Sequence, residues 1–179
     1  MNNVIHIEYF KTPIGELILG SFEDKLCIAD WRFRKMRNAI DERIKKGLTA
    51  NYKETESEIV KQTKIQIEEY FNTKRKTFDI PLLLIGTDFQ ISVWNALQQI
   101  PYGQTLSYLE LSKNLNNEKA IRAIASANGA NAISIIIPCH RIIGTNGSLV
   151  GYAGGLKAKS KLLSLENSLI NKQLVLFEN

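Results

Sequence analysis

The sequence predicts an α+β fold in two parts, a small mixed domain over residues 1–85 and a mainly helical domain over residues 86–179. Two observations predict it. Residues 4–31 alternate apolar and polar side chains as strands do, and from residue 86 onward one capped helical segment follows another. The 179 residues, 44% of them hydrophobic, are enough to bury a core.

The first part begins with three short apolar segments, "VIHIEYF", "ELILGSF" and "KLCIADW", which turn sequences separate. They predict a three-stranded antiparallel meander. Met36, Ile40 and Ile44 lie four residues apart, which indicates the apolar face of a helix within "RFRKMRNAIDERIKKG". A second helix is expected over "ESEIVKQTKIQIEEYFN", followed by an extended segment, "KTFDIPLLL".

The second part contains two capping boxes, in which a hydroxyl residue is followed three positions later by Gln or Glu. Thr87 with Gln90 predicts the start of one helix. Ser107 with Glu110 predicts the start of the next.

A third helix is expected over "NEKAIRAIASANG", with Asn117 as its N-cap and Gly129 as a left-handed residue at its end. The short "LNNE" turn before it predicts a helix-turn-helix. "ISIIIP" then predicts a strand, and Asn146-Gly147 predicts a hairpin turn. Three helices with a hairpin outline a winged helix-turn-helix, which favours DNA binding. A last helix is expected around "KAKSKLLSLENSLI".

The composition narrows the classes of function. Lys and Arg number 23 against 18 Asp and Glu, a formal net charge of +5, which suits a polyanionic partner without requiring one. No apolar stretch has the length of a membrane span, and the first residues lack the pattern of a secretory signal. Two cysteines cannot form a disulfide framework, so the expected location is the cytoplasm.

The sequence "IIIPCHRII" places Cys139 beside His140, one of only two histidines. A lone cysteine behind three isoleucines is more often a core residue. Pro138, however, is expected to end the strand and leave Cys139 on a turn. His140 can lower the cost of forming a thiolate, and Glu166 is the nearest downstream carboxylate that could orient the imidazole. A Cys-His-Glu chain is therefore available, whereas nothing has the spacing of a zinc site.

The other cysteine and histidine lie in the first part of the chain. Cys27 is predicted to be a core residue because it falls within an alternating strand pattern. His6 is expected to be a surface histidine or one with its hydrogen bonds satisfied, rather than a ligand.

A longer series of motifs points to a family. In order, they are "GTDFQISVWNALQQIPYGQTLSY", Arg122 in "KAIRAI", Asn131, "IPCHRII", "GYAGG" and "LLSLE". Through nearly all of its second half the chain resembles the O6-alkylguanine-DNA alkyltransferases. "TPIGELILG" and "FDIPL" fit the variable N-terminal domain of that family, which implies a ribonuclease H-like fold for residues 1–85.

The resemblance implies irreversible transfer of an alkyl group from guanine O6, and also from thymine O4, in double-stranded DNA to the protein's own cysteine. Cys139 matches the acceptor, and His140 would take the thiol proton through a water molecule. Glu166 would orient His140, and Tyr108 would help to rotate the base and donate a proton to the leaving guanine. The resemblance implies a monomer without a cofactor. Some members of the family carry a structural zinc in the N-terminal domain, but with only Cys27 and His6 there no such site is expected.

The family flips the damaged base out through the minor groove, using the second helix of the helix-turn-helix. Arg122 matches the residue that fills the gap left in the base stack. Ala123, Ser126 and Ala127 lie on the same helix and are small enough to let its backbone approach the groove. Without the resemblance, alanines here would indicate only good helix formation.

The remaining family positions shape the pocket. Asn131 is expected to tie the helix-turn-helix to the active-site turn. The pocket wall is expected to include backbone groups around Cys139 and Ile142, together with Tyr152, Ala153 and Gly154.

The chain departs from the family at two of its positions. Ala132 stands where many members have proline, which predicts a less rigid turn. Ala153 stands where some members have a serine that reaches the alkylated oxygen, so one hydrogen-bond donor is missing.

Three other functions remain open. An alkyltransferase-like damage sensor would flip the base without reacting, but such proteins replace the acceptor cysteine, usually by tryptophan. A cysteine hydrolase lacks an oxyanion-hole motif here, and adjacent residues rarely form its catalytic pair. A winged-helix regulator would call for a longer basic recognition helix.

Overall fold

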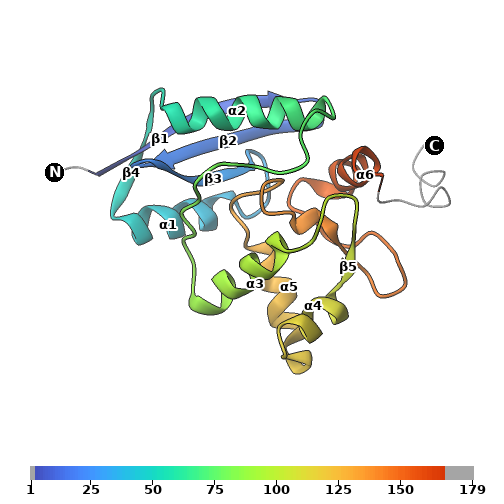
Figure 1. Ribbon diagram of the computed structural model, residues 1–179. Helices are drawn as coiled ribbons and strands as arrows, with labels where there is room; N and C mark the ends of the chain where they lie inside the picture. The colour runs from blue at the N-terminus through green and yellow to red at the C-terminus, as the bar shows by residue number, and fades with distance from the viewer. Residues whose placement is uncertain (1–2, 168–179) are drawn as a thin grey trace.

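The computed structural model describes residues 3–167, which form a four-stranded sheet with a helix on each face, followed by a group of short helices (Figure 1). This is the α+β architecture that the sequence predicts. None of the described helices is long and apolar enough to cross a lipid bilayer.

The sheet consists of β1 (Asn3–Thr12), β2 (Gly15–Phe22), β3 (Lys25–Trp31) and β4 (Ala50–Glu54), in the order β3-β2-β1-β4. Strands β1, β2 and β3 pair antiparallel, which confirms the predicted meander. The sequence analysis missed β4, which pairs parallel with β1 at the edge of the sheet. Its sequence lacks a clear apolar alternation because only Ala50 is buried.

Helices α1 (Arg37–Leu48) and α2 (Glu58–Phe71) cover opposite faces of this sheet (Figure 1). Helix α1 buries Ile40 and Ile44, as their spacing predicts. Met36 does not share that face: it precedes the first helical residue and is 50% exposed. The four-residue spacing therefore predicts the buried face of the helix correctly, but that face begins one turn later than expected.

The predictions for Cys27 and His6 are confirmed. Cys27 is buried in the core between the sheet and α1, and burial raises the pKa of its thiol to about 12. His6 is half-buried, and its Nδ1 lies 2.6 Å from the Thr55 hydroxyl oxygen.

Both capping boxes form. Helix α3 (Asp88–Gln98) starts after Thr87, and α4 (Tyr108–Asn114) starts after Ser107. In each, the hydroxyl accepts a hydrogen bond from the third helical backbone N–H while the carboxylate or amide there accepts one from the cap's own N–H. This local chemistry fixes the start of α4 and hence the position of Tyr108.

The third helix of the group differs from its prediction at both ends. A short 3-10 turn, Glu118–Ala120, precedes α5 (Ile121–Gly129), and the Asn117 side chain makes no capping hydrogen bond. Gly129 is the last helical residue rather than a left-handed one. Arg34 donates a hydrogen bond to the Gly129 carbonyl, so that carbonyl is satisfied without a left-handed turn.

The run "ISIIIP" is a tight loop rather than a strand. Ile135 has a φ of 73°, a left-handed conformation that is unusual for a β-branched residue and that turns the chain. Two isolated bridges hold the loop, Ala29 with Ile133 and Ser134 with Ile137. Burial explains why the apolar residues are there, but tertiary contacts decide their conformation.

The predicted hairpin wing is absent from the described residues. The turn itself forms, with the Gly144 N–H donating to the Ser148 carbonyl over 2.8 Å. Its flanks do not pair with each other, because β6 (Ile142–Ile143) pairs in parallel with β5 (Leu106–Ser107). The Lys159 ammonium also takes the carbonyls of Ile142 and Val150 as acceptors.

The last described helix is α6 (Gly155–Leu165), and Glu166 caps its C-terminal end. The predicted helix extends to residue 170, and its part after residue 167 lies outside the described residues.

Two backbone hydrogen bonds join the halves of the chain. The Ala29 N–H in β3 donates to the Ala132 carbonyl, and the Ser134 N–H donates to the Ala29 carbonyl. One hydrophobic core also runs from the face of the sheet beneath α2 to α3, α5 and α6. The loop that carries Ala132 is thus anchored to the sheet. That alanine in place of proline makes this turn less rigid stays a prediction.

Candidate active site

Cys139 lies at a surface hollow of about 330 Å³ between the two parts of the molecule. Cys139 as a whole residue is only 3% exposed. The lining comes from the loop after β3, from α4 and α5, and from the segment before α6. The lining residues are Arg34, Lys35, Met36, Tyr108, Ala125, Asn128, Gly129, Cys139, Gly151, Tyr152 and Ala153.

A 3-10 turn, Cys139–Arg141, presents the cysteine directly after Pro138. The Cys139 N–H donates to the Ile137 carbonyl over 2.8 Å. Asn131 holds the same loop, since its side-chain Nδ2 donates to the Ile137 carbonyl over 3.1 Å and its Oδ1 accepts from the Ile133 N–H over 2.9 Å. These contacts fit the hinge position that the resemblance implies for Asn131.

Burial raises the pKa of the Cys139 thiol, although the Asn131 side chain and the positive charges of Arg34 and Lys159 act in the opposite direction. At neutral pH the sulfur therefore carries its proton. No hydrogen bond joins it directly to His140 within residues 3–167. A reaction at this sulfur needs a base that takes the proton as the new bond forms.

His140 and Glu166 form a fully buried pair, with His140 Nε2 2.9 Å from Glu166 Oε1. Burial lowers the pKa of His140 below its ordinary value of 6.5, although the carboxylate opposes the shift. Because the carboxylate can only accept, a neutral His140 must carry its proton on Nε2. Nδ1, which is buried and has no hydrogen-bond partner among residues 3–167, is then the acceptor.

The Glu166 carboxylate is held in place by several donors. Arg141 grips both oxygens, with Nε 2.8 Å from Oε2 and Nη2 2.9 Å from Oε1. Tyr70 donates to Oε1 over 2.7 Å, and the Gly103 N–H donates to Oε2 over 3.3 Å. Burial alone would raise the pKa of Glu166, but the hydrogen bonds from His140 and Arg141 lower it to about 2.

The sequence analysis missed these donors, two of which are side chains. Arg141 follows His140 directly in "PCHR", so its position in the sequence already indicated a cation close to the His140–Glu166 pair. Tyr70 lies 96 residues before Glu166, and no local pattern links them.

Tyr108 is the first residue of α4 and lines the hollow together with Tyr152 and Ala153. Burial raises the pKa of its phenol, so the hydroxyl keeps its proton. Asn128 of α5 donates to the Tyr108 oxygen over 3.2 Å. Asn128, which the sequence analysis also missed, thus fixes the phenol while leaving its O–H available as a donor.

The predicted DNA-binding residues divide into two groups. Arg122, Ala123 and Ser126 are exposed on α5. Ala127 is 2% exposed, and its carbonyl accepts a hydrogen bond from the Trp94 indole, so its side chain belongs to the core rather than to that surface.

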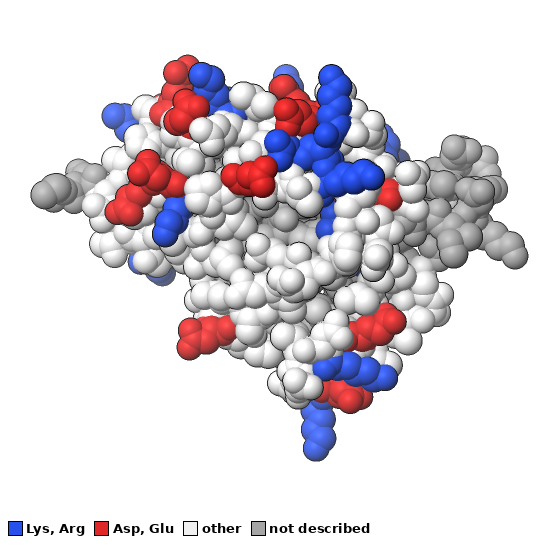
Figure 2. All heavy atoms as spheres, in the orientation of Figure 1, with Lys and Arg blue, Asp and Glu red and all other residues white. Residues whose placement is uncertain are grey.

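Charge is spread unevenly over the molecule. On the face shown in Figure 2, Lys and Arg gather over the end of α2 and the loop after it, while the helices of the second part carry few charges. Helix α5 itself carries a single charged side chain, that of Arg122, so a nucleic-acid contact through α5 depends on a small number of cations.

Of the residues expected around the pocket, Tyr152 and Ala153 line the hollow. The Ile142 side chain is fully buried, so Ile142 can contribute to the wall only through its backbone. Gly154 was expected to allow backbone close to a base, but a Cβ at Gly154 would lie 2.4 Å from the Trp31 indole. Its missing side chain serves the packing of this segment on β3.

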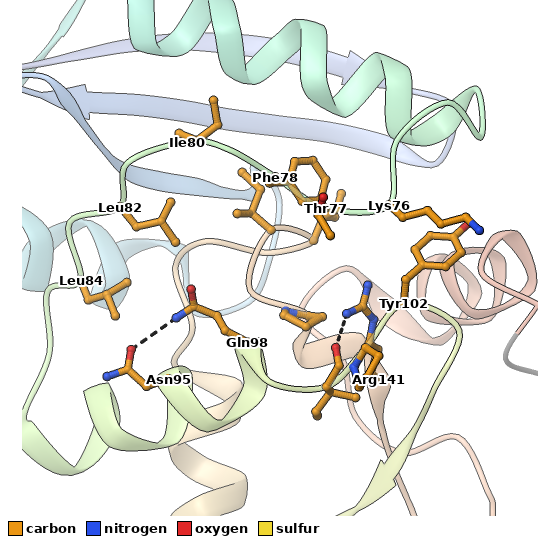
Figure 3. A pocket seen from close by; sticks show the side chains of 15 residues that line it. Lys76, Thr77, Phe78, Ile80, Leu82, Leu84, Asn95, Gln98, Tyr102 and Arg141 are labelled. Atoms are coloured by element: carbon orange, nitrogen blue, oxygen red, sulfur yellow. Dashed lines mark hydrogen bonds between the residues drawn. The ribbon is translucent and has the colours of Figure 1, made fainter.

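A second hollow, of about 520 Å³, lies between residues 76–84 and the end of α3 (Figure 3). Most of the residues that line it are apolar, and the lining also includes Tyr102, Pro138 and Arg141. Cys139 does not line it, so the smaller hollow is the one that can bring a substrate to the sulfur.

Comparison with known proteins gives matches for both parts of the chain. Residues 5–84 match the model of the ribonuclease-like domain of 6-O-methylguanine DNA methyltransferase, and residues 88–168 match that of its DNA-binding domain.

Two curated relatives match over nearly their whole length. A methylated-DNA–protein-cysteine methyltransferase from Methanosarcina acetivorans is 45% identical over 159 residues, which are 89% of this chain and 96% of that protein. A constitutive methyltransferase of the same name from Bacillus subtilis is 40% identical over 157 residues, 87% of this chain and 92% of that protein.

A solved structure extends the likeness to the fold. The crystal structure of Mycobacterium tuberculosis OGT in complex with DNA is 36% identical, with a TM-score of 0.78 over 97% of this chain and 99% of that one. Taken with the relatives and the buried cysteine, it leads to one conclusion. The chain belongs to the methylated-DNA–protein-cysteine methyltransferase family.

Proposed function

We propose that the protein repairs alkylated DNA by moving an alkyl group from guanine O6, or from thymine O4, in a duplex onto its own Cys139. The observation that carries this proposal is the buried thiol at an open hollow, next to the His140–Glu166 pair. Membership of the family supports the same reaction.

In the proposed reaction the thiol proton passes through a water molecule to His140 Nδ1 while the sulfur attacks the alkyl carbon. The new S–C bond forms as the C–O bond breaks, and the bonding electron pair stays on the guanine oxygen. The base takes a proton from the Tyr108 hydroxyl, which regains one from His140 through solvent. The net change moves the alkyl group to sulfur and the thiol proton to guanine.

A thioether has no easy reverse step, so each protein molecule acts once. The buried thiol is suited to this chemistry because sulfur is a soft nucleophile and its proton has a nearby acceptor. The raised pKa of Tyr108 supports its role, since a phenol that keeps its proton can give it to the leaving base.

We infer that the protein binds DNA through the exposed side of α5, from the minor groove. The small side chains of Ala123 and Ser126 suit a close approach, and Arg122 is long enough to enter the stack when the damaged base turns out. We further propose that it works as a monomer in the cytoplasm.

Removal of the lesion tests the proposal. The purified protein is mixed with a duplex that carries one O6-methylguanine, and the remaining lesion is measured as protein is added. We expect one lesion lost per protein molecule, no loss with Cys139→Ser, and an unchanged result with the matched control Cys27→Ser. More than one lesion removed per molecule, or full activity in Cys139→Ser, would contradict it.

A further inference from the structure

Tyr70 belongs to the first part of the chain but reaches the centre of the candidate active site. It lies in the last turn of α2, and its side chain is fully buried. In Figure 1 this end of α2 lies over the region where α6 and the active-site turn meet. Its hydroxyl donates to Glu166 Oε1 over 2.7 Å.

The rings around Tyr70 leave it little freedom. Its ring centroid lies 5.5 Å from that of Phe71, 5.6 Å from Phe78 and 6.2 Å from Tyr102. Figure 3 shows Phe78, Tyr102 and Arg141 around the neighbouring hollow, with Arg141 bonded to a backbone carbonyl. The hydroxyl is therefore presented to the carboxylate in a fixed direction.

The donor role of Tyr70 follows from the charge state of its partner. The carboxylate stays ionised because its pKa is lowered to about 2, and burial, together with that negative charge, raises the pKa of the phenol. Tyr70 must then donate and Glu166 must accept.

Tyr70 and His140 share one oxygen. Glu166 Oε1 accepts from the Tyr70 hydroxyl, from His140 Nε2 at 2.9 Å and from Arg141 Nη2 at 2.9 Å. Within residues 3–167, Tyr70 is the only one of the carboxylate's donors that comes from the first 85 residues. A donor on the shared oxygen fixes its position and also draws negative charge away from His140.

We propose that Tyr70 is a positioning residue for alkyl transfer, which fixes the Glu166 carboxylate and thereby the direction and basicity of the His140 imidazole. The proposal rests on the proposed function and gives the N-terminal part a role in the chemistry. Tyr70 acts only through Glu166 and touches neither the sulfur nor the base.

Loss of the Tyr70 hydroxyl has two expected effects. The carboxylate is held less firmly, so transfer slows. Glu166 also attracts the imidazolium more strongly, so His140 takes up a proton at a higher pH and stops acting as a base there. The other charged groups that act on His140 are Arg141 and Lys159, and Tyr152 is the neighbouring ring at 6.3 Å.

The test compares Tyr70→Phe with the matched control Tyr102→Phe. Both variants lose one hydroxyl from the same aromatic cluster, but Tyr102 donates to the Leu165 backbone carbonyl rather than to Glu166. The rate constant of a single turnover on an O6-methylguanine duplex is measured from acid to neutral pH. Thermal unfolding of each variant checks that it is folded.

We expect Tyr70→Phe to transfer the methyl group about tenfold more slowly. A positioned general base raises a rate by roughly a hundredfold or more, and the variant should lose only part of that increase. The pH at which its rate falls to half should also move upward. Tyr102→Phe should match the wild type in both. Equal rates and profiles for the two variants would overturn the proposal.

A double-mutant cycle separates the route through Glu166 from a general packing effect. If Tyr70 acts through this carboxylate, Tyr70→Phe should slow a Glu166→Gln protein far less than it slows the wild type. An equal slowing in both backgrounds would mean that Tyr70 acts elsewhere. A wild-type protein that moves no methyl to Cys139 would instead refute the proposed function itself.

Discussion

At the scale of single residues, the candidate site combines a protonated thiol with a neutral histidine whose Nδ1 can accept a proton. Burial raises the pKa of Cys139 and lowers that of His140, so both are neutral at physiological pH. Two neutral groups suit a proton transfer that accompanies bond formation. The ionised Glu166 stabilises the imidazolium that this transfer creates.

The same pair makes folding depend on pH. The pKa of Glu166 is about 2 in the folded protein against an ordinary 4.5, and that of His140 lies below its ordinary 6.5. In both cases the unfolded chain takes up a proton before the folded one does. The free energy of unfolding contributed by the pair is therefore complete above about pH 6.5, and it falls as the pH drops through 6.5 and then 4.5 towards 2.

Urea unfolding at a series of pH values from about 7.5 to about 4 measures this dependence. We expect a steady loss of stability towards acid, with a shallower slope below about pH 5 in Glu166→Gln because that variant has no carboxyl there to protonate. A stability that stays level or rises between about pH 6.5 and about 4.5 would contradict the protonation states assigned to the pair.

At the scale of elements, the segment before α6 depends on its packing against β3. A Cβ on Gly154 would lie 2.4 Å from the Trp31 indole, while a Cβ on Gly151 would have nothing within 4 Å. Gly154→Ala should lower the free energy of unfolding by about 1–3 kcal/mol, the usual cost of overpacking. Gly151→Ala is the matched control and should change it by less than about 0.5 kcal/mol in the same urea titration. Equal effects would mean that the contact with Trp31 is not what requires glycine.

Helix α5 carries the prediction about DNA. Arg122→Ala should slow repair of a duplex strongly, because nothing then fills the gap left by the flipped base, while reaction with free O6-benzylguanine should change much less. Lys119→Ala removes the same charge from a nearby exposed site and is the control. Comparable losses on duplex and free base in Arg122→Ala would show that Arg122 acts through the fold.

At the scale of the whole molecule, Arg34 fastens the first part to the second. Its guanidinium binds Asp30, at 2.9 and 3.1 Å to the two carboxylate oxygens, and also the Gly129 and Asn131 carbonyls. The side chains of Arg34 and Asp30 are only 4% and 0% exposed. The junction therefore depends on a buried ion pair formed at and just after the end of β3, whose arginine also donates to backbone carbonyls at the end of α5 and in the loop that follows it.

Arg34→Ala leaves Asp30 buried with fewer donors and should lower the free energy of unfolding by about 3 kcal/mol. The pair of Arg32 with Glu16 is the control, because the Arg32 side chain is 38% exposed. Arg32→Ala should cost less than about 1 kcal/mol. If urea unfolding gave the same loss in the free energy of unfolding for both variants, Arg34 would not be what joins the two parts.

Features that depend on residues close together in the sequence could be predicted, and features that depend on distant residues could not. The capping boxes of Thr87 and Ser107 were predictable because their partners lie three residues away. The conformation of Ile135 and the hydrogen bond of Tyr70 to Glu166 were not, because distant parts of the chain determine them. The Cys-His-Glu chain could be proposed from residue types. The position of Arg141 next to His140 was a further signal in the sequence, but its two hydrogen bonds to Glu166 are evident only from the structure.

The most direct test of the central claim follows one methyl group. The protein is incubated with a duplex that carries a radiolabelled methyl on guanine O6, digested, and its peptides are separated and counted. We expect one labelled methyl per protein molecule, all of it on the peptide that contains Cys139. Label on the Cys27 peptide, or methyl released into solution while lesions continue to disappear, would contradict the account.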